Sequence, residues 1–213
     1  MSKIQEISAA VEAGKAKIIG ELVIEALNEG ADPSEILNKG MIDAMAAVGE
    51  RFSRGDIFVP EMLVAARAMK TGVETLKPHL ASGATSANGK VILGTVAGDL
   101  HDIGKNLVGM MIESAGFEVI DLGVDVPIDK FVEVVKENPD AKIVALSALL
   151  TTTMPAMRDT VKALCDLESR NNFKILVGGA PITQDYANEI GANAYSPDAA
   201  SAAQKAKELV AVA

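Results

Sequence analysis

The sequence is poor in cysteine and in aromatic residues, and each shortage narrows the class of protein. Its single cysteine, Cys165, cannot form a disulfide within the chain, which is typical of proteins from reducing compartments. No histidine lies near this thiol in the sequence, so we expect it to be structural. Trp is absent and aromatic residues make up only 3%, so aliphatic side chains and Met must fill the core of this 213-residue chain.

Long apolar runs and an excess of positive charge are also missing. No apolar run approaches the roughly 20 residues of a membrane helix, and the first residues are too polar for a secretory signal. We therefore expect a soluble, cytoplasmic protein. The formal net charge of -9 disfavours a nucleic-acid partner, because phosphate binding needs a basic surface.

The first 80 or so residues show only helical periodicity. Apolar residues recur three and four positions apart, with breaks near Gly14, Gly30 and Gly55. Four amphipathic helices with short connections predict a small antiparallel bundle, which we assign to residues 1–82. Small polar residues then predict a linker at 83–89.

From residue 90 the periodicity changes to apolar strands that alternate with helices. The strands are predicted at about 91–96, 117–122, 142–147, 173–177 and 194–195. This alternation predicts βαβ units and a doubly wound, Rossmann-like (flavodoxin-like) five-stranded parallel sheet over 90–213. Continuous apolar runs fit strands that are covered on both faces.

Ligands of such a sheet bind at the loops that follow its strands. The loop after the first strand carries Asp99-x-His101-x-x-Gly104. An imidazole with a carboxylate two residues before it is typical of a metal ligand and its supporting partner.

Two later loops suit a long, polar, phosphate-bearing ligand. The loop after the third strand offers four hydroxyls between Ser147 and Thr153, and the loop after the fourth begins with Gly178-Gly179. Adjacent glycines let backbone amides approach a ligand closely. No G-x-G-x-x-G or P-loop pattern is present in the sequence, which disfavours a dinucleotide and excludes a P-loop.

Three motifs, which follow the first, third and fourth predicted strands, together indicate a protein family, although each motif alone is a weak signal. They are Asp99-x-His101-x-x-Gly104, Ser147-x-Leu149 and Gly178-Gly179. Together they resemble the cobalamin-binding domain of corrinoid methyltransferase proteins and of methionine synthase. The helical segment before them, with a helix start at Val59-Pro60-Glu61-Met62, resembles the four-helix cap of the same proteins. The resemblance covers nearly the whole chain.

The resemblance implies cobalamin or a related corrinoid, bound without its own base and with a histidine on cobalt (base-off/His-on). His101 would be this axial ligand, Asp99 would hydrogen-bond its far nitrogen, and Thr153 stands where methionine synthase has a serine that ends the relay. Gly104 would leave room for the nucleotide tail. The residues implied to bind the cofactor are Asp99, His101, Asp102, Ile103, Gly104, Ser147, Leu149, Thr151, Thr153, Gly178, Gly179, Phe58 and Met62.

The resemblance also implies a methyl carrier rather than a complete enzyme. A substrate-specific methyltransferase would load a methyl group from methanol, a methylamine, a betaine or a methoxylated aromatic. A second methyltransferase would pass it to coenzyme M or tetrahydrofolate, as in methanogenesis or acetogenesis. A reductive activator would rescue oxidised cobalt.

Plainer interpretations stay open for several of these residues. Taken alone, His101 is an exposed loop histidine, and the Thr151-Thr152-Thr153 run is a helix cap. Gly178-Gly179 is equally an ordinary turn. Asp121 and Asp125 suggest a cation site, although we expect them to serve the start of a loop.

Asp102 and two residues of the N-terminal helical segment also have plainer interpretations. Asp102 suits a helix start that is favoured by the helix dipole. Phe58 and Met62 suit a plain bundle core.

Other functions also stay open. A cobalamin-binding subunit of an adenosylcobalamin-dependent mutase resembles the second domain but lacks a cap of this type. A cobalamin-responsive regulator would carry a DNA-binding domain, which the sequence does not show and the acidic charge disfavours. A flavodoxin-like or response-regulator-like domain with a helical appendage would bind no corrinoid.

Overall fold

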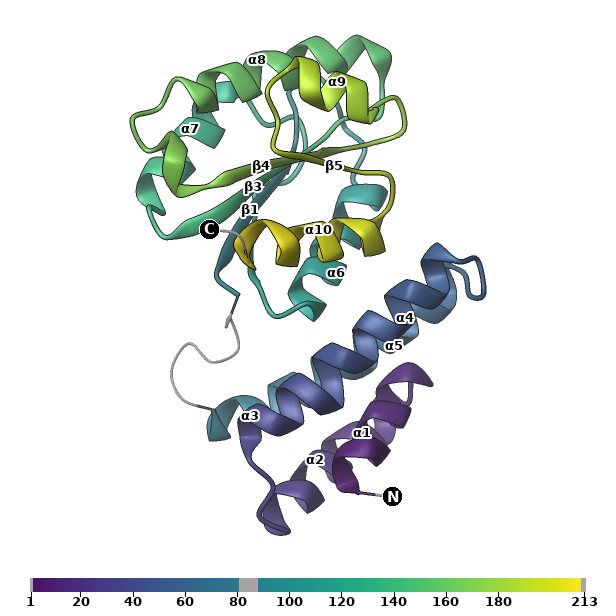
Figure 1. The fold of residues 1–213 in the computed structure, drawn as a ribbon. Helices are drawn as coiled ribbons and strands as arrows, with labels where there is room; N and C mark the ends of the chain where they lie inside the picture. The colour runs from purple at the N-terminus through teal and green to yellow at the C-terminus, as the bar shows by residue number, and fades with distance from the viewer. Residues whose placement is uncertain (1, 81–87, 212–213) are drawn as a thin grey trace. The chain divides into compact units, whose positions relative to one another are not determined.

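The computed structural model describes residues 2–80 and 88–211, and the chain divides into a helical unit and an α/β unit (Figure 1). The main division falls between residues 87 and 88. Most of the linker predicted at 83–89 lies outside the described residues. A helical unit followed by a parallel α/β unit is the fold class that the sequence predicts.

Polar caps and prolines set the helix starts of the helical unit. The Ser2 hydroxyl accepts a hydrogen bond from the backbone N–H of Gln5, and the Asp32 carboxylate accepts one from that of Glu35. Such side chains satisfy backbone donors that have no partner within the helix. The helices of this unit are α1 (Lys3–Glu12), α2 (Ala16–Asn28), α3 (Pro33–Glu35), the π-helix η1 (Ile36–Ile42), α4 (Asp43–Ser53), α5 (Val59–Leu76) and the 3₁₀ turn η2 (Lys77–His79).

The π-helix η1 departs from the predicted α-helical geometry. Gly40 lies in η1 against Ile7 of α1, and a Cβ on Gly40 would lie 3.1 Å from Cγ2 of Ile7. The missing side chain therefore lets α1 pack closely on the wider π turn. Over only seven residues, apolar spacing does not distinguish a π-helix from an α-helix.

The α/β unit is a five-stranded sheet with the order β2-β1-β3-β4-β5 and parallel pairing throughout. Helices α7, α8 and α9 cover one face, and α6 and α10 cover the other (Figure 1). The strands are β1 (Lys90–Thr95), β2 (Glu118–Asp121), β3 (Ala141–Ser147), β4 (Lys174–Gly178) and β5 (Ala194–Ser196). The helices are α6 (Ile103–Ser114), α7 (Ile128–Glu137), η4 (Thr151–Thr153), α8 (Met154–Cys165), η5 (Arg170–Asn172), α9 (Gln184–Glu189) and α10 (Ala199–Ala211).

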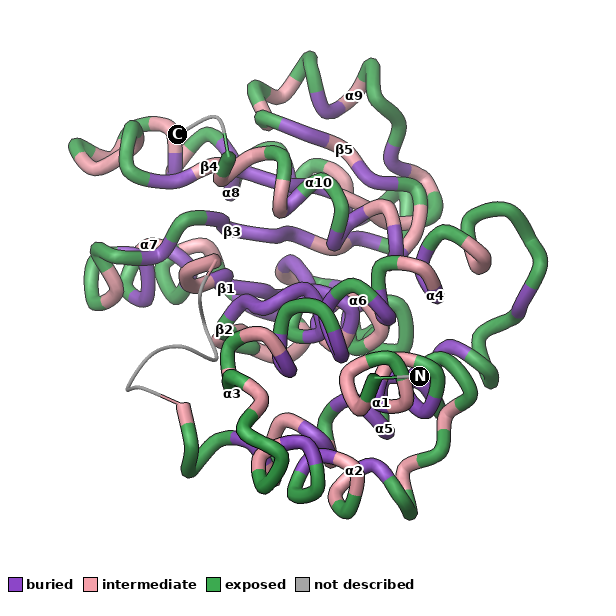
Figure 2. The backbone as a smooth tube through the Cα atoms, turned by 60° about the horizontal axis from the view of Figure 1, so that its bottom comes forward, coloured by how far each residue is buried: buried purple, intermediate pink, exposed green. Residues whose placement is uncertain are grey.

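The central strands are buried on both faces, whereas β2 forms a half-exposed edge (Figure 2). Phe131 of α7 is fully buried against the sheet, and a Cβ on Gly94 of β1 would lie 2.8 Å from its Cζ. Glycine at position 94 therefore makes room for the aromatic ring, in a core that is otherwise almost entirely aliphatic.

The strand register aligns the carboxyl ends of four strands. Thr95 of β1 pairs with Ser147 of β3, Ser147 with Gly178 of β4, and Gly178 with Ser196 of β5. The loops that follow β1, β3 and β4 therefore begin side by side at one edge of the sheet. Parallel α/β sheets bind their ligands at this edge.

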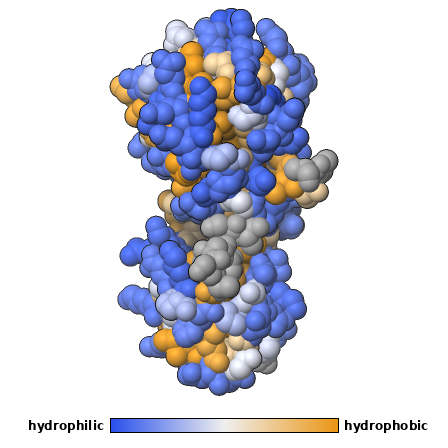
Figure 3. All heavy atoms as spheres, turned by 90° about the vertical axis from the view of Figure 1, so that its left-hand side faces the viewer, coloured by the Kyte–Doolittle hydropathy of each residue, from blue (hydrophilic) through white to orange (hydrophobic). Residues whose placement is uncertain are grey.

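The surface of the protein is largely polar. Charged and polar side chains cover most of the face drawn in Figure 3, in keeping with the charged-residue content of 23%. Across residues 2–80 and 88–211, none of the helices is both long enough and apolar enough to cross a bilayer.

Candidate functional site

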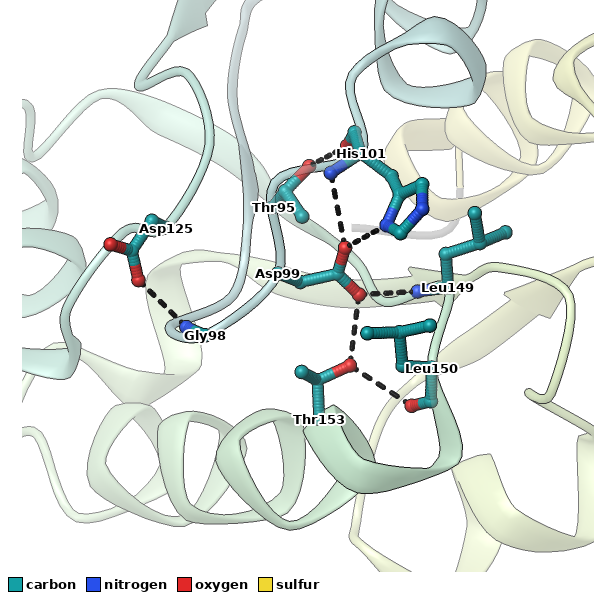
Figure 4. A network of polar contacts seen from close by, with 8 residues as sticks. All are labelled: Thr95, Gly98, Asp99, His101, Asp125, Leu149, Leu150 and Thr153. Carbon is teal, nitrogen blue, oxygen red and sulfur yellow. Dashed lines mark hydrogen bonds and ion pairs between the residues drawn. The ribbon is translucent and has the colours of Figure 1, made fainter.

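The carboxylate of Asp99 is the centre of a polar network at the carboxyl edge of the sheet (Figure 4). Asp99 is fully buried, and its Oδ1 accepts hydrogen bonds from the Nδ1 (2.7 Å) and the backbone N–H (3.1 Å) of His101. Its Oδ2 accepts from the backbone N–H of Leu149 (2.7 Å) and from the hydroxyl of Thr153 (2.8 Å). The carboxylate thus joins the loop after β1 to the loop after β3.

These hydrogen bonds keep Asp99 ionised. Burial by itself would raise the pKa of the carboxyl, because a charge is poorly solvated inside the protein. The N–H of Leu149, both groups of His101 and the Thr153 hydroxyl outweigh burial and hold the pKa of Asp99 well below its ordinary value. An ionised carboxylate can only accept, so Nδ1 of His101 carries the proton of the neutral imidazole, and Nε2 is left with a lone pair.

The imidazole of His101 is half-exposed, and several apolar side chains in neighbouring segments are exposed as well. Its own side chain is 50% exposed, so Nε2 is open to a ligand. Exposed apolar side chains on the loops after β1 and β3 and at the start of α6 are Leu100, Ile103, Leu149 and Leu150. A gathering of exposed apolar side chains is typical of a binding surface, because water otherwise surrounds it at a cost.

Thr153 stands at the N-cap of α8, but its hydroxyl makes no capping bond to that helix. Its single proton is shared instead between the carboxylate of Asp99 (2.8 Å) and the carbonyl of Leu150 (2.9 Å). The helix-cap interpretation of the Thr151-Thr152-Thr153 run was compatible with one hydroxyl facing Asp99, and in the structure Thr153 faces Asp99 without capping the helix. Thr151, in the same 3₁₀ turn, is exposed.

The two glycine motifs have different surroundings. A Cβ on Gly104, in the first turn of α6, would meet no protein atom within 4 Å. A Cβ on Gly179 would lie 1.8 Å from the carbonyl oxygen of Ala148, and Gly179 has a φ of +129°. The packing of the protein itself therefore requires glycine at 179, whereas it does not at 104.

Gly179→Ala is expected to destabilise the protein by about 2–3 kcal/mol, because the new methyl group overlaps a backbone atom and the φ is unfavourable. Urea unfolding of the protein without cofactor measures the change. Gly191→Ala is the control for a positive φ without steric overlap, since a Cβ at Gly191 (φ +82°) meets nothing within 4 Å. Equal losses in the two variants would contradict the steric explanation.

The remaining predicted site residues come from both units. Asp102 directly precedes α6 and accepts a hydrogen bond from the side chain of Asn106 (3.2 Å), and Ile103 is 83% exposed. In the helical unit, Phe58 precedes α5 and is 69% exposed, whereas Met62 is fully buried. Only Phe58 of this pair therefore offers apolar surface to a ligand.

The structure also reveals polar contacts that the sequence did not predict. The Thr95 hydroxyl donates to the carbonyl of His101 (3.0 Å), and the N–H of Gly98 donates to the carboxylate of Asp125 (2.7 Å). The ammonium group of Lys105, which is 2% exposed, is paired with Asp121. Gly98 finds its partner in the loop after β2, 27 positions away, and Lys105 finds its partner at the last residue of β2, 16 positions away, which no local pattern in the sequence indicates.

The family comparisons identify both units. B12 binding domain families match residues 89–204 and residues 3–77. The chain is 47% identical over 209 residues to dimethylamine corrinoid protein 1 of Methanosarcina acetivorans, which covers 98% of this chain and 97% of the relative.

Solved structures agree with these matches. A cobalamin-binding protein from Desulfitobacterium hafniense DCB-2 is similar with a TM-score of 0.82 and 34% identity, over 97% of this chain and 98% of that chain. The methanol:cobalamin methyltransferase complex MtaBC from Methanosarcina barkeri is similar with a TM-score of 0.85 and 28% identity, over 99% of this chain and 80% of that chain. Fold and family matches together define a B12-binding protein. The chain belongs to the corrinoid protein family, whose relatives include the dimethylamine corrinoid proteins.

Proposed function

We propose that this chain is the methyl-carrying corrinoid protein of a methylamine methyltransferase system, and that dimethylamine is the methyl donor. One observation carries the carrier role: Nδ1 of His101 is held by buried Asp99, so Nε2 is presented at the carboxyl edge of the sheet. The choice of donor is supported by the 47% identical relative, which is named a dimethylamine corrinoid protein.

The residues at this edge fit a corrinoid. His101 supplies a single nitrogen donor, which suits a metal that carries its other ligands in a macrocycle. The space beside Gly104 is free of protein atoms, so a ligand can occupy what a side chain would fill. The exposed Leu100, Ile103 and Leu149 suit the apolar flank of a large ring.

We assign the proposed roles as follows. His101 binds cobalt through Nε2 in place of the cofactor's own base (base-off/His-on), and when bound the corrinoid supplies the cobalt centre that accepts and releases the methyl group. Phe58 and Met62 are the residues of the helical unit that we propose for the cofactor, and of these Phe58 is the exposed one. The residues proposed to accommodate the ring edge and nucleotide tail are Asp102, Ile103, Gly104, Ser147, Leu149, Thr151, Gly178 and Gly179.

Asp99 and Thr153 have a supporting role in this proposal. Asp99 holds the proton on Nδ1 of His101 and so fixes both the tautomer and the direction of the ring. The Thr153 hydroxyl donates to the other oxygen of the carboxylate and can adjust its basicity as the demand on His101 changes.

The proposal implies protein partners. A methylamine-specific methyltransferase supplies the methyl group, and a second methyltransferase passes it to coenzyme M or tetrahydrofolate. A reductive activator keeps the cofactor in its active oxidation state.

Gly104→Leu is expected to weaken the binding of hydroxocobalamin by at least about tenfold, because the side chain fills space proposed for the cofactor. The fold is expected to remain at least as stable, since Gly is a poor helix former and a Cβ at 104 meets no protein atom. Absorbance titration and thermal unfolding measure the two effects. Gly104→Ala is the matched small variant, and unchanged affinity in both would remove this residue from the proposed site.

The function itself is tested by methyl uptake. Protein reconstituted with hydroxocobalamin is incubated with its activator and labelled dimethylamine, monomethylamine, trimethylamine or methanol, each with the cognate methyltransferase. Uptake from dimethylamine is expected to be at least about tenfold faster than from the other donors. Faster uptake from another donor would reassign the substrate. Failure with every donor, together with isomerase activity of the adenosyl form, would favour the mutase alternative.

A further inference from the structure

The loops after β1 and β2 are joined by a reciprocal pair of hydrogen bonds. The N–H of Gly98 donates to Oδ1 of Asp125 (2.7 Å), and the N–H of Asp125 donates to the carbonyl of Asp99 (2.9 Å). In Figure 4, Asp125 reaches Gly98 from the side of the loop opposite Leu149. One residue thus holds the backbone on both sides of Asp99.

Asp125 has an unusual backbone conformation. Its φ is +50°, and in the part of the chain that the structure describes no other residue except glycine has a positive φ. This left-handed conformation is unfavourable for L-residues, although Asp and Asn tolerate it better than most. Backbone strain of this kind persists only where the surrounding structure enforces it, and it is concentrated at functional sites.

The strained conformation has a geometric use. It turns the backbone N–H and the side-chain carboxylate of Asp125 toward the same short segment, where they meet Asp99 and Gly98. Gly98 has a φ of +81° and lacks a side chain, and within this turn the N–H of Asp99 donates to the carbonyl of Val96 (3.2 Å), so the bonds of Asp125 add a restraint. The carboxylate of Asp99 is held by Leu149, Thr153 and His101, whereas Asp125 holds the backbone from which that carboxylate extends.

We propose that Asp125 is a positioning residue, which fixes the backbone of Asp99 and thereby aims Nε2 of His101 at the metal. The inference rests on the proposed function, because it assumes that His101 is the axial ligand. Asp125 is exposed and its bonds go to the backbone of residues 98 and 99, so it acts through Asp99.

Three substitutions separate positioning from folding. Asp125→Asn keeps an oxygen acceptor and tolerance of the left-handed conformation. Asp125→Gly relieves the strain but removes the acceptor, and Asp125→Ala loses both advantages. Asp166→Gly is the control for an Asp-to-Gly substitution elsewhere in the α/β unit. Asp166 is exposed at the C-cap of α8, at the end of that helix opposite Thr153.

The first readout uses the protein without cofactor. In Asp125→Gly, amide hydrogen exchange at Gly98 is expected to become at least about tenfold faster, while the unfolding temperature stays close to that of the unmodified protein. Asp125→Asn is expected to retain protection, and Asp166→Gly to leave exchange at Gly98 unchanged. Unchanged exchange at Gly98 in Asp125→Gly would overturn the proposal.

The second readout is the axial nitrogen signal. Protein carrying ¹⁵N-histidine is loaded with hydroxocobalamin and reduced to the Co(II) form, whose electron paramagnetic resonance spectrum is split by the axial nitrogen. The fraction with the ¹⁵N pattern is expected to fall about tenfold in Asp125→Gly and Asp125→Ala, and to be restored in Asp125→Asn. A role in folding alone predicts that the signal follows thermal stability and survives in Asp125→Gly.

The two proposals fail differently in this experiment. If the unmodified protein lacks the ¹⁵N pattern, His101 is not the ligand, and both the His-on proposal and this inference are wrong. If the unmodified protein shows the pattern and Asp125→Gly shows it equally, only the inference about Asp125 is wrong.

Discussion

Replacing His101 by Ala is expected to abolish the axial nitrogen signal of protein-bound cobalamin. The sequence contains only two histidines, and His101 is the one held by Asp99 at the edge of the sheet. Without its imidazole, Asp99 has no means of reaching a metal, and no ¹⁵N-histidine splitting can appear. We also expect hydroxocobalamin to bind at least about tenfold more weakly, because a metal ligand contributes at least as much as the residues that support it.

The chain supplies its own control for this experiment. His79 lies in the 3₁₀ turn η2 of the helical unit, and His79→Ala is expected to keep both signal and affinity. Added imidazole is expected to restore part of the axial signal in His101→Ala, because the substitution leaves space beside Asp99. If the nitrogen signal is lost in His79→Ala and retained in His101→Ala, the axial ligand is His79 and the prediction for His101 is wrong.

Replacing Asp99 by Ala is expected to cost the protein about 3–5 kcal/mol of unfolding free energy, even without cofactor. The variant leaves the N–H groups of His101 and the backbone N–H of Leu149 without their buried acceptor, whereas the hydroxyl of Thr153 keeps the carbonyl of Leu150. Each unsatisfied buried group costs about 1–3 kcal/mol. Urea unfolding at pH 7 measures the loss.

Asp99→Asn and Thr153→Val test how much each hydrogen bond to Asp99 contributes to the free energy of unfolding. Asn keeps one acceptor oxygen but places an amide group against the donor of Leu149, so we expect roughly half the loss of the Ala variant. Thr153→Val removes a single donor and is expected to cost about 1 kcal/mol. Equal losses in Asp99→Ala and Thr153→Val would mean that Leu149 and His101 contribute nothing to the network.

The Asp99 network also predicts the pH dependence of stability. Hydrogen bonds hold the pKa of Asp99 below its ordinary value, so the native protein binds fewer protons here than the unfolded chain does. The stabilisation is therefore complete above the unfolded pKa of about 3.9 and is lost as the pH falls further. We expect the stability difference between the unmodified protein and Asp99→Asn to be constant from pH 7 to 5 and to shrink below about pH 4.

Much of the fold followed from short-range patterns. Apolar runs of five or six residues, separated by helical stretches, predicted the first four strands, a short segment at 194–195 was predicted as the fifth, and the parallel sheet is confirmed. These features depend on backbone preferences and on burial periodicity, which neighbouring residues determine. The spacing of Asp99 and His101 is equally local, and their hydrogen bond lies within one turn of loop.

The partners of Asp99 beyond His101 depend on the tertiary fold. Thr153 is 54 positions away and Leu149 is 50, and their contacts exist because β3 lies beside β1. The resemblance to methionine synthase proposed Thr153 for a relay, but no pattern within this sequence indicated the bond from the Leu149 backbone. The role of these residues at a bound cofactor stays a prediction.

The sequence by itself determined the two-part architecture, the strand order along the chain and a histidine with a carboxylate two residues before it. The tertiary structure alone decided that Asp125 would brace Gly98, that Lys105 would be buried beside Asp121, and that Met62 would be buried while Phe58 is exposed. The reason is physical, because the spacing of apolar residues indicates only which face of a helix or strand is buried. The partner of a polar group is chosen only when strand order and loop conformation bring distant residues within about 3 Å.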